Sequence, residues 1–235
     1  MVTALNRVPE PAVEDASAEA EVYDKMDHTA VNEAFCVDLL AAVETAGLGP
    51  KLHDGVDPLR LLDVGTGTAR IPIMLARRPI FLKPIVVEPD EAMLNRARLN
   101  MYASGLQANI DLRAGAAGSL EFEDGAFDAV MSNSVLHHMD DVTAGLADMV
   151  RVLRPGGLLF VRDLARPASE QDVTELVTRH ASSEPEAAKT LLEQSLRAAY
   201  TPDEITEIAK AVGLPDADLV MSSDRHWTLS AVKPG

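Results

Sequence analysis

The fold is decided by the nine residues LLDVGTGTA at positions 61–69. An apolar run that ends in a pair of glycines and leads into a helix predicts a buried strand over Leu59 to Val64. A tight turn is expected over Gly65 to Thr68, and a helix from about Ala69 to Arg78. Such a turn presents backbone N–H groups and a surface free of side chains to a ligand at the carboxyl edge of a sheet.

Three residues help to separate the classes of ligand. Nicotinamide, flavin and adenosylmethionine enzymes all use such a turn, but the dinucleotide fingerprint has glycine or alanine at its sixth position, where this chain has Arg70. Asp63 lies directly before the turn, where a carboxylate suits a cationic amino-acid group better than a pyrophosphate. Glu88 follows the second strand about 20 residues later, where a carboxylate accepts hydrogen bonds from ribose hydroxyls. The alternative for Glu88 is a solvated strand end.

Strands and helices alternate along most of the chain. Further strands are predicted at Ile85 to Glu88, Asn109 to Arg113, Phe127 to Ser132 and Leu158 to Asp163, with helices from Asp90 to Gly105 and from about Asp141 to Leu153. The alternation is typical of a parallel sheet with right-handed crossovers. A capping box at Thr201 begins a last helix, and the apolar stretches 218–221 and 227–232 predict a terminal hairpin.

Three segments lie outside this alternation. Residues 1 to about 20 are expected to form a loosely held arm. Residues 19–46 are expected to form one or two helices before the first strand, which serve as a cap and not as a separate domain. Two helices at about 169–182 and 185–200 arrive without a strand between them, which predicts an insertion beside the active site. We therefore expect one domain, with arm and cap at 1–50, core at 57–164, helical insertion or lid at 167–200, and final helix and hairpin at 201–235.

Composition narrows the classes of function. The 235 residues are 47% hydrophobic and 25% charged, as in an ordinary globular protein. A formal net charge of −16 would repel a phosphate backbone, so nucleic acid is not an expected partner. No apolar run approaches the roughly 20 residues that span a bilayer, and Met1 to Pro11 lacks the pattern of a signal peptide. We expect a cytoplasmic protein that does not bind membranes.

Five blocks of sequence, in order, resemble one family. The blocks are Leu61 to Ala69, Val87 to Asp90, Gly115 to Phe122, Phe127 to His138 and Leu153 to Gly157. They resemble the class I S-adenosylmethionine-dependent methyltransferases of the small-molecule type, related to the quinone-biosynthesis C-methyltransferases. The resemblance covers about Tyr23 to Asp163. It implies an α/β, Rossmann-like methyltransferase fold with a mostly parallel seven-stranded sheet and a C-terminal antiparallel hairpin, and S-adenosylmethionine as the cofactor, with S-adenosylhomocysteine as its product.

The resemblance also implies which residues bind the cofactor. From the methionine end of the cofactor to its adenine end, they are Asp63, Gly65, Thr66, Gly67, Glu88, Pro89, Met93, Ala116 and Ala117. The set also includes Tyr23, which closes over the cofactor, and Asn133 and Ser134, which lie beneath the sulfonium. The chain departs from the family pattern at Ala69, which stands in place of the third glycine of the usual turn. It departs again at Ala116, where relatives commonly have an aspartate that bonds the adenine amino group.

Histidines are the candidate catalytic residues. Methyl transfer from a sulfonium depends mainly on alignment, and a base is needed only when the acceptor must lose a proton. His137, His138 and His28 can take such a proton because histidine titrates near neutral pH. Alternatively, one of the adjacent histidines fixes the loop and the other faces solvent. Asp163 is either a substrate contact or a loop anchor.

No metal site is expected from the sequence. Adjacent histidines rarely bind one ion together, and no paired ligand spacing supports a site. Cys36 is the only cysteine, which excludes an internal disulfide and a cysteine-based metal cluster.

The leading function is methyl transfer from S-adenosylmethionine to oxygen, nitrogen or carbon of a small metabolite by in-line displacement. The second hypothesis is a catalytically silent adenosylmethionine-binding module. The third is a nicotinamide-dependent oxidoreductase, which Arg70 disfavours. The sequence does not identify the acceptor. The oligomeric state is left open, with a homodimer as one option.

Overall fold

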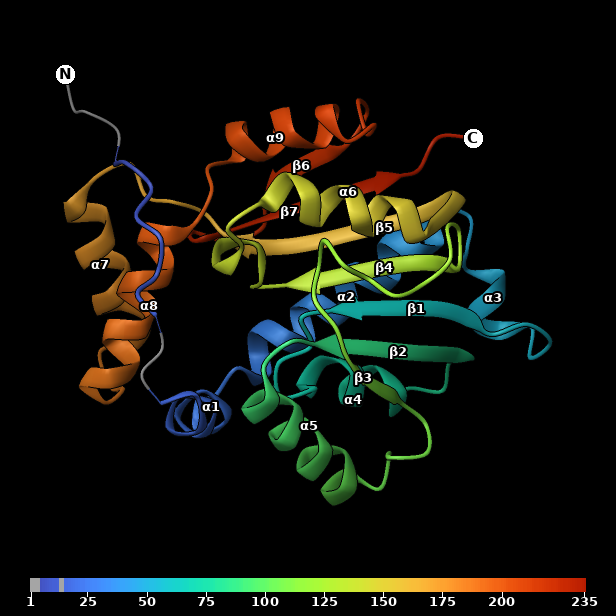
Figure 1. Cartoon of the computed structure of the whole chain (residues 1–235), viewed down its shortest axis with the longest axis horizontal. Coiled ribbons are helices and arrows are strands. Elements are labelled where there is room, and N and C mark those ends of the chain that lie inside the picture. Colours follow the sequence, from blue (N-terminus) through green and yellow to red (C-terminus); the bar gives the residue numbers. More distant parts are fainter. Residues whose placement is uncertain (1–4, 13–14) are drawn as a thin grey trace.

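The computed structural model describes residues 5–12 and 15–235. Its centre is a seven-stranded sheet with the strand order β3-β2-β1-β4-β5-β7-β6 (Figure 1). Strands β1 to β5 are parallel to one another, and β7 is antiparallel to both β5 and β6, which confirms the predicted fold. The strands are β1 Leu59–Val64, β2 Leu82–Glu88, β3 Asp111–Ala114, β4 Phe127–Asn133, β5 Leu153–Leu164, β6 Asp218–Met221 and β7 His226–Val232.

Helices cover both faces of the sheet and extend beyond one end of it (Figure 1). They are α1 Ala16–Lys25, α2 Thr29–Thr45, α3 Pro50–His53, α4 Arg70–Ala76, α5 Glu91–Ser104, α6 Val142–Val152, α7 Glu170–Ala181, α8 Glu186–Ala198, α9 Pro202–Ala211 and the short 3-10 helix η1 Leu136–His138. Within the described ranges, none is long and apolar enough to cross a membrane.

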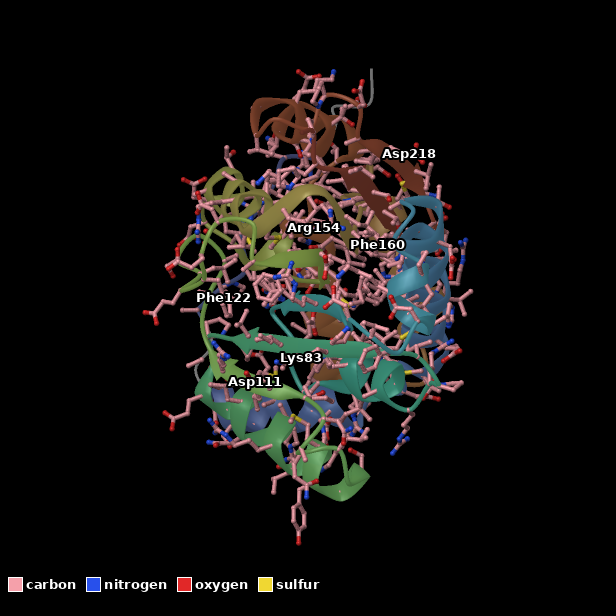
Figure 2. All side chains as sticks on the ribbon, turned by 90° about the vertical axis from the view of Figure 1, so that its right-hand side faces the viewer. Lys83, Asp111, Phe122, Arg154, Phe160 and Asp218 are labelled. Atoms are coloured by element: carbon pink, nitrogen blue, oxygen red, sulfur yellow. The ribbon has the colours of Figure 1, made fainter. Side chains whose placement is uncertain are left out.

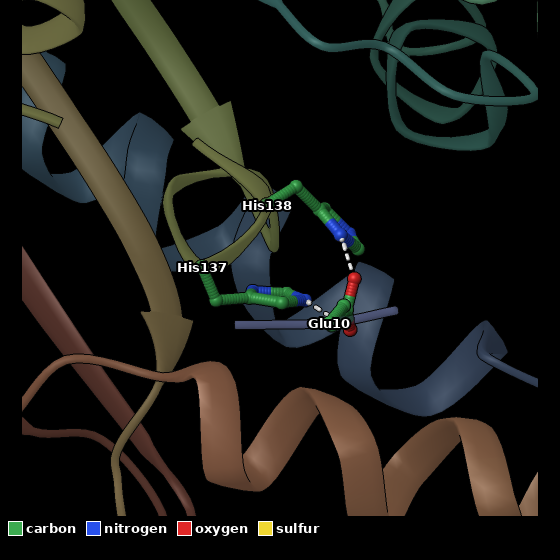
Figure 3. A group of neighbouring side chains, drawn as sticks. All are labelled: Glu10, His137 and His138. Carbon is green, nitrogen blue, oxygen red and sulfur yellow. Dashed lines mark hydrogen bonds and ion pairs between the residues drawn. The ribbon is translucent and has the colours of Figure 1, made fainter. Parts of the chain in front are cut away.

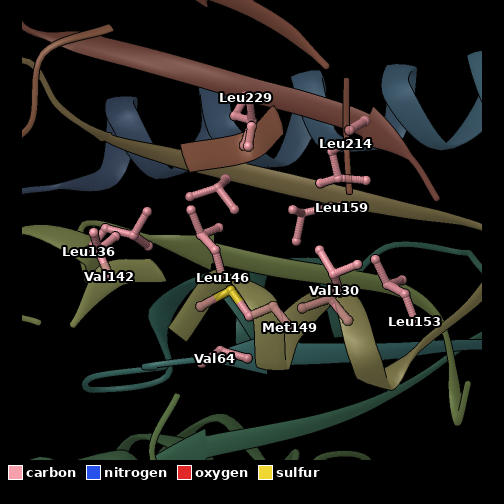
Figure 4. Packing of buried hydrophobic residues seen from close by; sticks show 14 of the residues in the cluster. Val64, Val130, Leu136, Val142, Leu146, Met149, Leu153, Leu159, Leu214 and Leu229 are labelled. Atoms are coloured by element: carbon pink, nitrogen blue, oxygen red, sulfur yellow. The ribbon is translucent and has the colours of Figure 1, made fainter. Parts of the chain in front are cut away.

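The side chains of the central strands pack alternately into two separate cores, because successive residues of a strand point to opposite faces of the sheet. Leu62 of β1 packs in one core with α6 and α9, seen from close by in Figure 4. Leu61 packs in the other, with α2 and α4. There Phe35 of α2 meets Phe160 of β5 edge to face, with ring centroids 5.2 Å apart; Phe160 is labelled among the side chains of Figure 2.

Local capping signals predicted several helix boundaries correctly. The Asp90 carboxylate accepts a hydrogen bond from the Met93 N–H at 2.8 Å, and Gly105 ends α5 with φ 72°. Thr201 and Glu204 form the predicted capping box of α9. These signals act within one helical turn, so they can be read without tertiary information.

The predicted beginning of β5 is wrong. The strand begins at Leu153, not Leu158, and pairs with β4 on both sides of an irregularity, first at Phe127 and again at Ala129. The Pro-Gly-Gly segment is therefore a bulge inside the strand. Arg154 holds it in place by donating from Nε to the Asp128 carboxylate at 2.7 Å.

The expectation of a loosely held arm is wrong for residues 5–12; residues 1–4 and 13–14 of the predicted arm lie outside the described residues. Arg7 donates from Nε to the carbonyl of Ala198 at 2.7 Å and from Nη2 to that of His137 at 3.0 Å. Its guanidinium also stacks on Tyr200, 4.3 Å from the ring centroid. Helix ends leave unpaired carbonyls, and Arg7 satisfies them. The arm is thereby held against α8 and η1.

Candidate active site

The glycine turn and the acidic end of β2 lie together at the carboxyl edge of the sheet. The N–H groups of Gly65 and Thr66 both donate to the carbonyl of Val87, at 2.9 and 3.0 Å. The N–H of Gly67 donates to Oε2 of Glu88 at 2.8 Å. Two segments that the sequence could only propose as neighbours are thus joined by direct hydrogen bonds.

Two buried carboxylates face this turn. Asp63 is 4% exposed and Glu88 is 7% exposed. Burial raises the pKa of Asp63 to about 7, and the charge of Glu88 contributes. Burial also raises the pKa of Glu88, although hydrogen bonds from the Asp90 and Gly67 N–H groups counteract it. In the part of the chain that the structure describes, neither is within ion-pair distance of a lysine, arginine or histidine. Uncompensated buried carboxylates suit a ligand that brings positive charge and hydroxyl groups.

The turn forms a cradle that only small residues allow. Gly65 and Gly67 have φ angles of 75° and 55°, in the left-handed region. A Cβ atom on Gly65 would lie 2.5 Å from Cγ2 of Val135. Oγ1 of Thr66 is buried and makes no well-aligned hydrogen bond among the residues described, although it is near enough to Asp63 to lower the pKa of that carboxyl against the larger effect of burial. An unpartnered hydroxyl beside a bare backbone surface is what a polar ligand would complete.

Replacing Gly65 with alanine tests the close approach. We expect a loss of about 1 kcal/mol from the left-handed backbone and about 1–3 kcal/mol more from overlap with Val135, measured by urea unfolding. Gly105→Ala is the matched control, because Gly105 has φ 72° with open space around its Cβ position. Equal losses in the two variants would contradict the overlap.

Tyr23 of α1 lies over the turn. Its Cε1 atom would be 4.0 Å from a Cβ atom on Gly67, and its ring tilts against His28 with centroids 5.0 Å apart. The neighbouring Asp24 accepts hydrogen bonds from Asn100 at 2.8 Å and Arg70 at 3.0 Å. These bonds attach α1 to α4 and α5, and so they position the tyrosine.

Other predicted cofactor residues lie at or just after the carboxyl ends of β2, β3 and β4, with Met93 in the first turn of α5. Ser134 follows β4 in a left-handed conformation, φ 56°, and its N–H donates to the Arg162 carbonyl at 2.8 Å. The N–H of Gly115 donates to the carbonyl of Glu88 at 3.2 Å, which brings the loop after β3 to the end of β2. The remaining members of the set are half-buried except Pro89, which is exposed; they are Met93, Ala116, Ala117 and Asn133. Their roles toward a cofactor stay predictions.

His137 and Asp163 form a buried pair at the end of β5. His137 is 3% exposed, and its Nδ1 lies 2.6 Å from Oδ1 of Asp163. Oδ2 of Asp163 accepts from the N–H groups of Val135 at 3.1 Å and Leu136 at 2.6 Å. Burial alone would raise the pKa of Asp163, but the charge and hydrogen bond of His137 hold it below its usual value. Of the two roles considered for Asp163, the geometry supports the loop anchor. With Nδ1 directed at Asp163, Nε2 is left to accept a proton.

Glu10 of the arm joins the histidines, and the sequence analysis did not identify it. Its Oε2 pairs with Nδ1 of His138, and its Oε1 lies 3.8 Å from Nε2 of His137 (Figure 3). Ser195 of α8 donates to Oε1 at 2.6 Å. No spacing or motif links Glu10 with residues so distant in the chain. His28, the third candidate base, contacts Tyr23 instead, and burial lowers its pKa.

Comparisons with known proteins agree with this geometry. A family model described as a methyltransferase domain matches residues 62–161. The chain is 32% identical over 167 residues to a demethylmenaquinone methyltransferase of Roseiflexus castenholzii, covering 67% of this chain and 68% of that protein. It is also 32% identical to a ubiquinone biosynthesis O-methyltransferase of Sinorhizobium fredii, over 52% of this chain and 48% of that protein. It thus spans about half the length of some relatives that it matches.

Solved structures share the fold. A crystal structure of a SAM-dependent methyltransferase from Aquifex aeolicus has a TM-score of 0.65 to this chain at 16% identity, covering 93% of this chain and 99% of that one. Identity at this level shows the common fold alone.

Proposed function

We propose a quinone-like or phenolic acceptor for this chain. The chain belongs to the class I S-adenosylmethionine-dependent methyltransferases, and it transfers the methyl group of S-adenosylmethionine to a small molecule. The relatives named above are demethylmenaquinone and ubiquinone-biosynthesis methyltransferases, so a hydroquinone or phenol is the acceptor class that they suggest. The observation that carries the cofactor assignment is the pair of uncompensated buried carboxylates, Asp63 and Glu88, on either side of the glycine turn.

The residues present fit the cofactor. S-adenosylmethionine would supply an electrophilic methyl group on a positively charged sulfur. Asp63 would bind the positively charged amino-acid group, and Glu88 would accept from the ribose hydroxyls. Thr66 offers its unpartnered hydroxyl, and Tyr23 would close the site from above. A cofactor held at several points leaves the methyl group with one direction of transfer, which is the main requirement of an in-line displacement.

The acceptor would lie on the side of His137. A phenol must lose its proton as the new bond to the methyl group forms, and Nε2 of His137 is the nitrogen left to take it. Asp163 holds the ring in the tautomer with hydrogen on Nδ1 and would stabilise the imidazolium that results. Glu10 faces the same nitrogen at 3.8 Å, so the acceptor has to displace it, which requires the arm to shift.

The helical insertion is proposed as the lid. Ser195 of α8 bonds Glu10, and the arm donates to the end of α8 through Arg7. The insertion, the arm and η1 therefore surround one region, and they would set acceptor specificity together. The division of the domain into arm, core, lid and hairpin, the cytoplasmic location and the homodimer remain predictions.

Binding and turnover test this function together. Isothermal titration calorimetry should show one site per chain for S-adenosylmethionine and for S-adenosylhomocysteine, with micromolar affinity. Mass spectrometry should then detect a methylated product from a panel of phenols and hydroquinones. Binding without any product across the panel would favour the silent binding module. Binding of NAD in place of S-adenosylmethionine would favour the oxidoreductase.

A further inference from the structure

We propose that Glu10, His137 and His138 form a binding site for one divalent transition-metal ion of the Zn²⁺ type. The histidine pair alone does not predict such a site, because two adjacent histidines lack a third ligand. The fold supplies the missing ligand from the N-terminal arm. The inference depends on these side chains and not on the methyl-transfer function.

The three donor groups lie close enough together to converge on one ion once the hydrogen bond between Nδ1 of His138 and Oε2 of Glu10 opens. One ligand atom from each residue, two imidazole nitrogens and a carboxylate oxygen, lies within 4.8 Å of the others. Zn²⁺ bonds of about 2.0–2.2 Å in a tetrahedral site place the ligand atoms about 3.3–3.6 Å apart. The 3.8 Å separation between Nε2 of His137 and Oε1 of Glu10 is therefore within a small side-chain adjustment of the required geometry. Figure 3 shows both imidazoles directed at the same carboxylate.

The surrounding hydrogen bonds have the pattern of a metal site's outer shell. A metal-bound histidine usually gives its other ring N–H to a carboxylate, which orients the ring and raises its basicity. Asp163 takes this position on Nδ1 of His137 at 2.6 Å. Ser195 donates to Oε1 of Glu10 at 2.6 Å and restrains the carboxylate in the same way. These contacts fix two of the three ligands before any ion arrives.

The charge of the cluster also favours a divalent cation. Glu10 and Asp163 both lie against the histidine pair, so with neutral imidazoles the cluster carries two negative charges. Arg7 is close, but its hydrogen bonds go to backbone carbonyls, including that of His137. A single proton would compensate only one of these charges. A divalent ion would compensate both.

Two imidazoles and one carboxylate select the class of metal. This donor set binds zinc and other first-row transition metals, whereas Mg²⁺ and Ca²⁺ require mainly oxygen ligands. Three protein ligands leave at least one coordination position open. Nε2 of His137 would coordinate the ion, so this nitrogen cannot accept a proton while the metal is bound.

Calorimetry on the full-length chain, without a histidine tag and stripped by a chelator, tests the site. Titration with Zn²⁺ should show one ion per chain with a Kd in the micromolar range or lower, and titration with Mg²⁺ should give no binding. Glu10→Gln and His138→Asn should each raise the Kd for Zn²⁺ at least about 10-fold. The visible absorption of added Co²⁺ should report a low-symmetry site in the wild type and lose intensity in both variants.

The chain offers a matched control in the exposed pair of His53 and Glu44, whose side chains lie 3.4 Å apart on the surface. Glu44→Gln and His53→Asn should leave the Kd for Zn²⁺ unchanged. Far-ultraviolet circular dichroism would show that all four variants are folded. The proposal would be overturned if the wild-type chain bound no Zn²⁺, or if Glu10→Gln and His138→Asn both kept the wild-type affinity for Zn²⁺. The cluster would then be a proton-bridged pair.

Discussion

His137→Asn is expected to lower kcat for a phenolic acceptor by about 100-fold or more, while the Kd for S-adenosylmethionine stays within about twofold. General base catalysis contributes roughly 10²–10⁴-fold when the proton must leave during the reaction, and asparagine keeps a hydrogen-bonding group toward Asp163 without a basic nitrogen. Steady-state kinetics give kcat, and calorimetry gives the Kd. The split between the two separates a catalytic role from a role in folding or cofactor binding.

The control for His137 is His53→Asn, which changes an exposed histidine of α3 that pairs with Glu44 and should leave kcat unchanged. Asp163→Asn should also reduce kcat, but with a loss of stability, because the Asp163 carboxylate anchors the loop through the N–H groups of Val135 and Leu136. If His137→Asn retained the wild-type kcat for a phenol, the assignment of the base would be wrong.

Asp63→Asn is expected to raise the stability of the free protein and to lower its affinity for the cofactor. In the free protein at pH 8 we expect the free energy of unfolding to rise by about 1–3 kcal/mol, because each pKa unit corresponds to about 1.4 kcal/mol and the amide must still be desolvated. The Kd for S-adenosylmethionine should rise about 10–100-fold, since a hydrogen bond to a charged group is worth roughly 1.5–3 kcal/mol. Urea unfolding and calorimetry measure the two effects.

The pH dependence of the wild type follows from the same carboxyl group. The folded pKa of Asp63, about 7, is above the usual value of 3.8, so between these values the folded chain binds more protons than the unfolded chain. The contribution of Asp63 to stability therefore falls as pH rises from about 4 to 7, and then stays constant. Asp63→Asn should remove this fall.

Cofactor affinity should show the reverse trend. Asp63 must be ionised to bind a positively charged group, so the Kd should increase up to about tenfold for each pH unit below about 7 in the wild type. In Asp63→Asn that dependence should be lost. A variant that loses both stability and affinity would indicate that Asp63 has a structural role instead.

The sequence determined those features that depend on neighbouring residues. The LLDVGTGTA stretch, the caps at Asp90 and Gly105 and the capping box at Thr201 each act within a few residues, and each is found where it was predicted. The parallel order of the strands follows from the alternation of strands and helices, because right-handed crossovers leave few topologies. Hence the fold and the glycine turn could be read from the sequence.

Only the tertiary structure decided which distant residues share the active site. Glu10 reaches His137 and His138 because Arg7 satisfies free carbonyls at the ends of α8 and η1, and Asp163 anchors its loop because β5 ends beside β4. The bulge after Leu153 likewise depends on Asp128 in the adjacent strand. Such contacts join segments far apart in the chain, and their free energy comes from burial and from pairing groups that local sequence leaves unpaired. No periodicity or spacing records them.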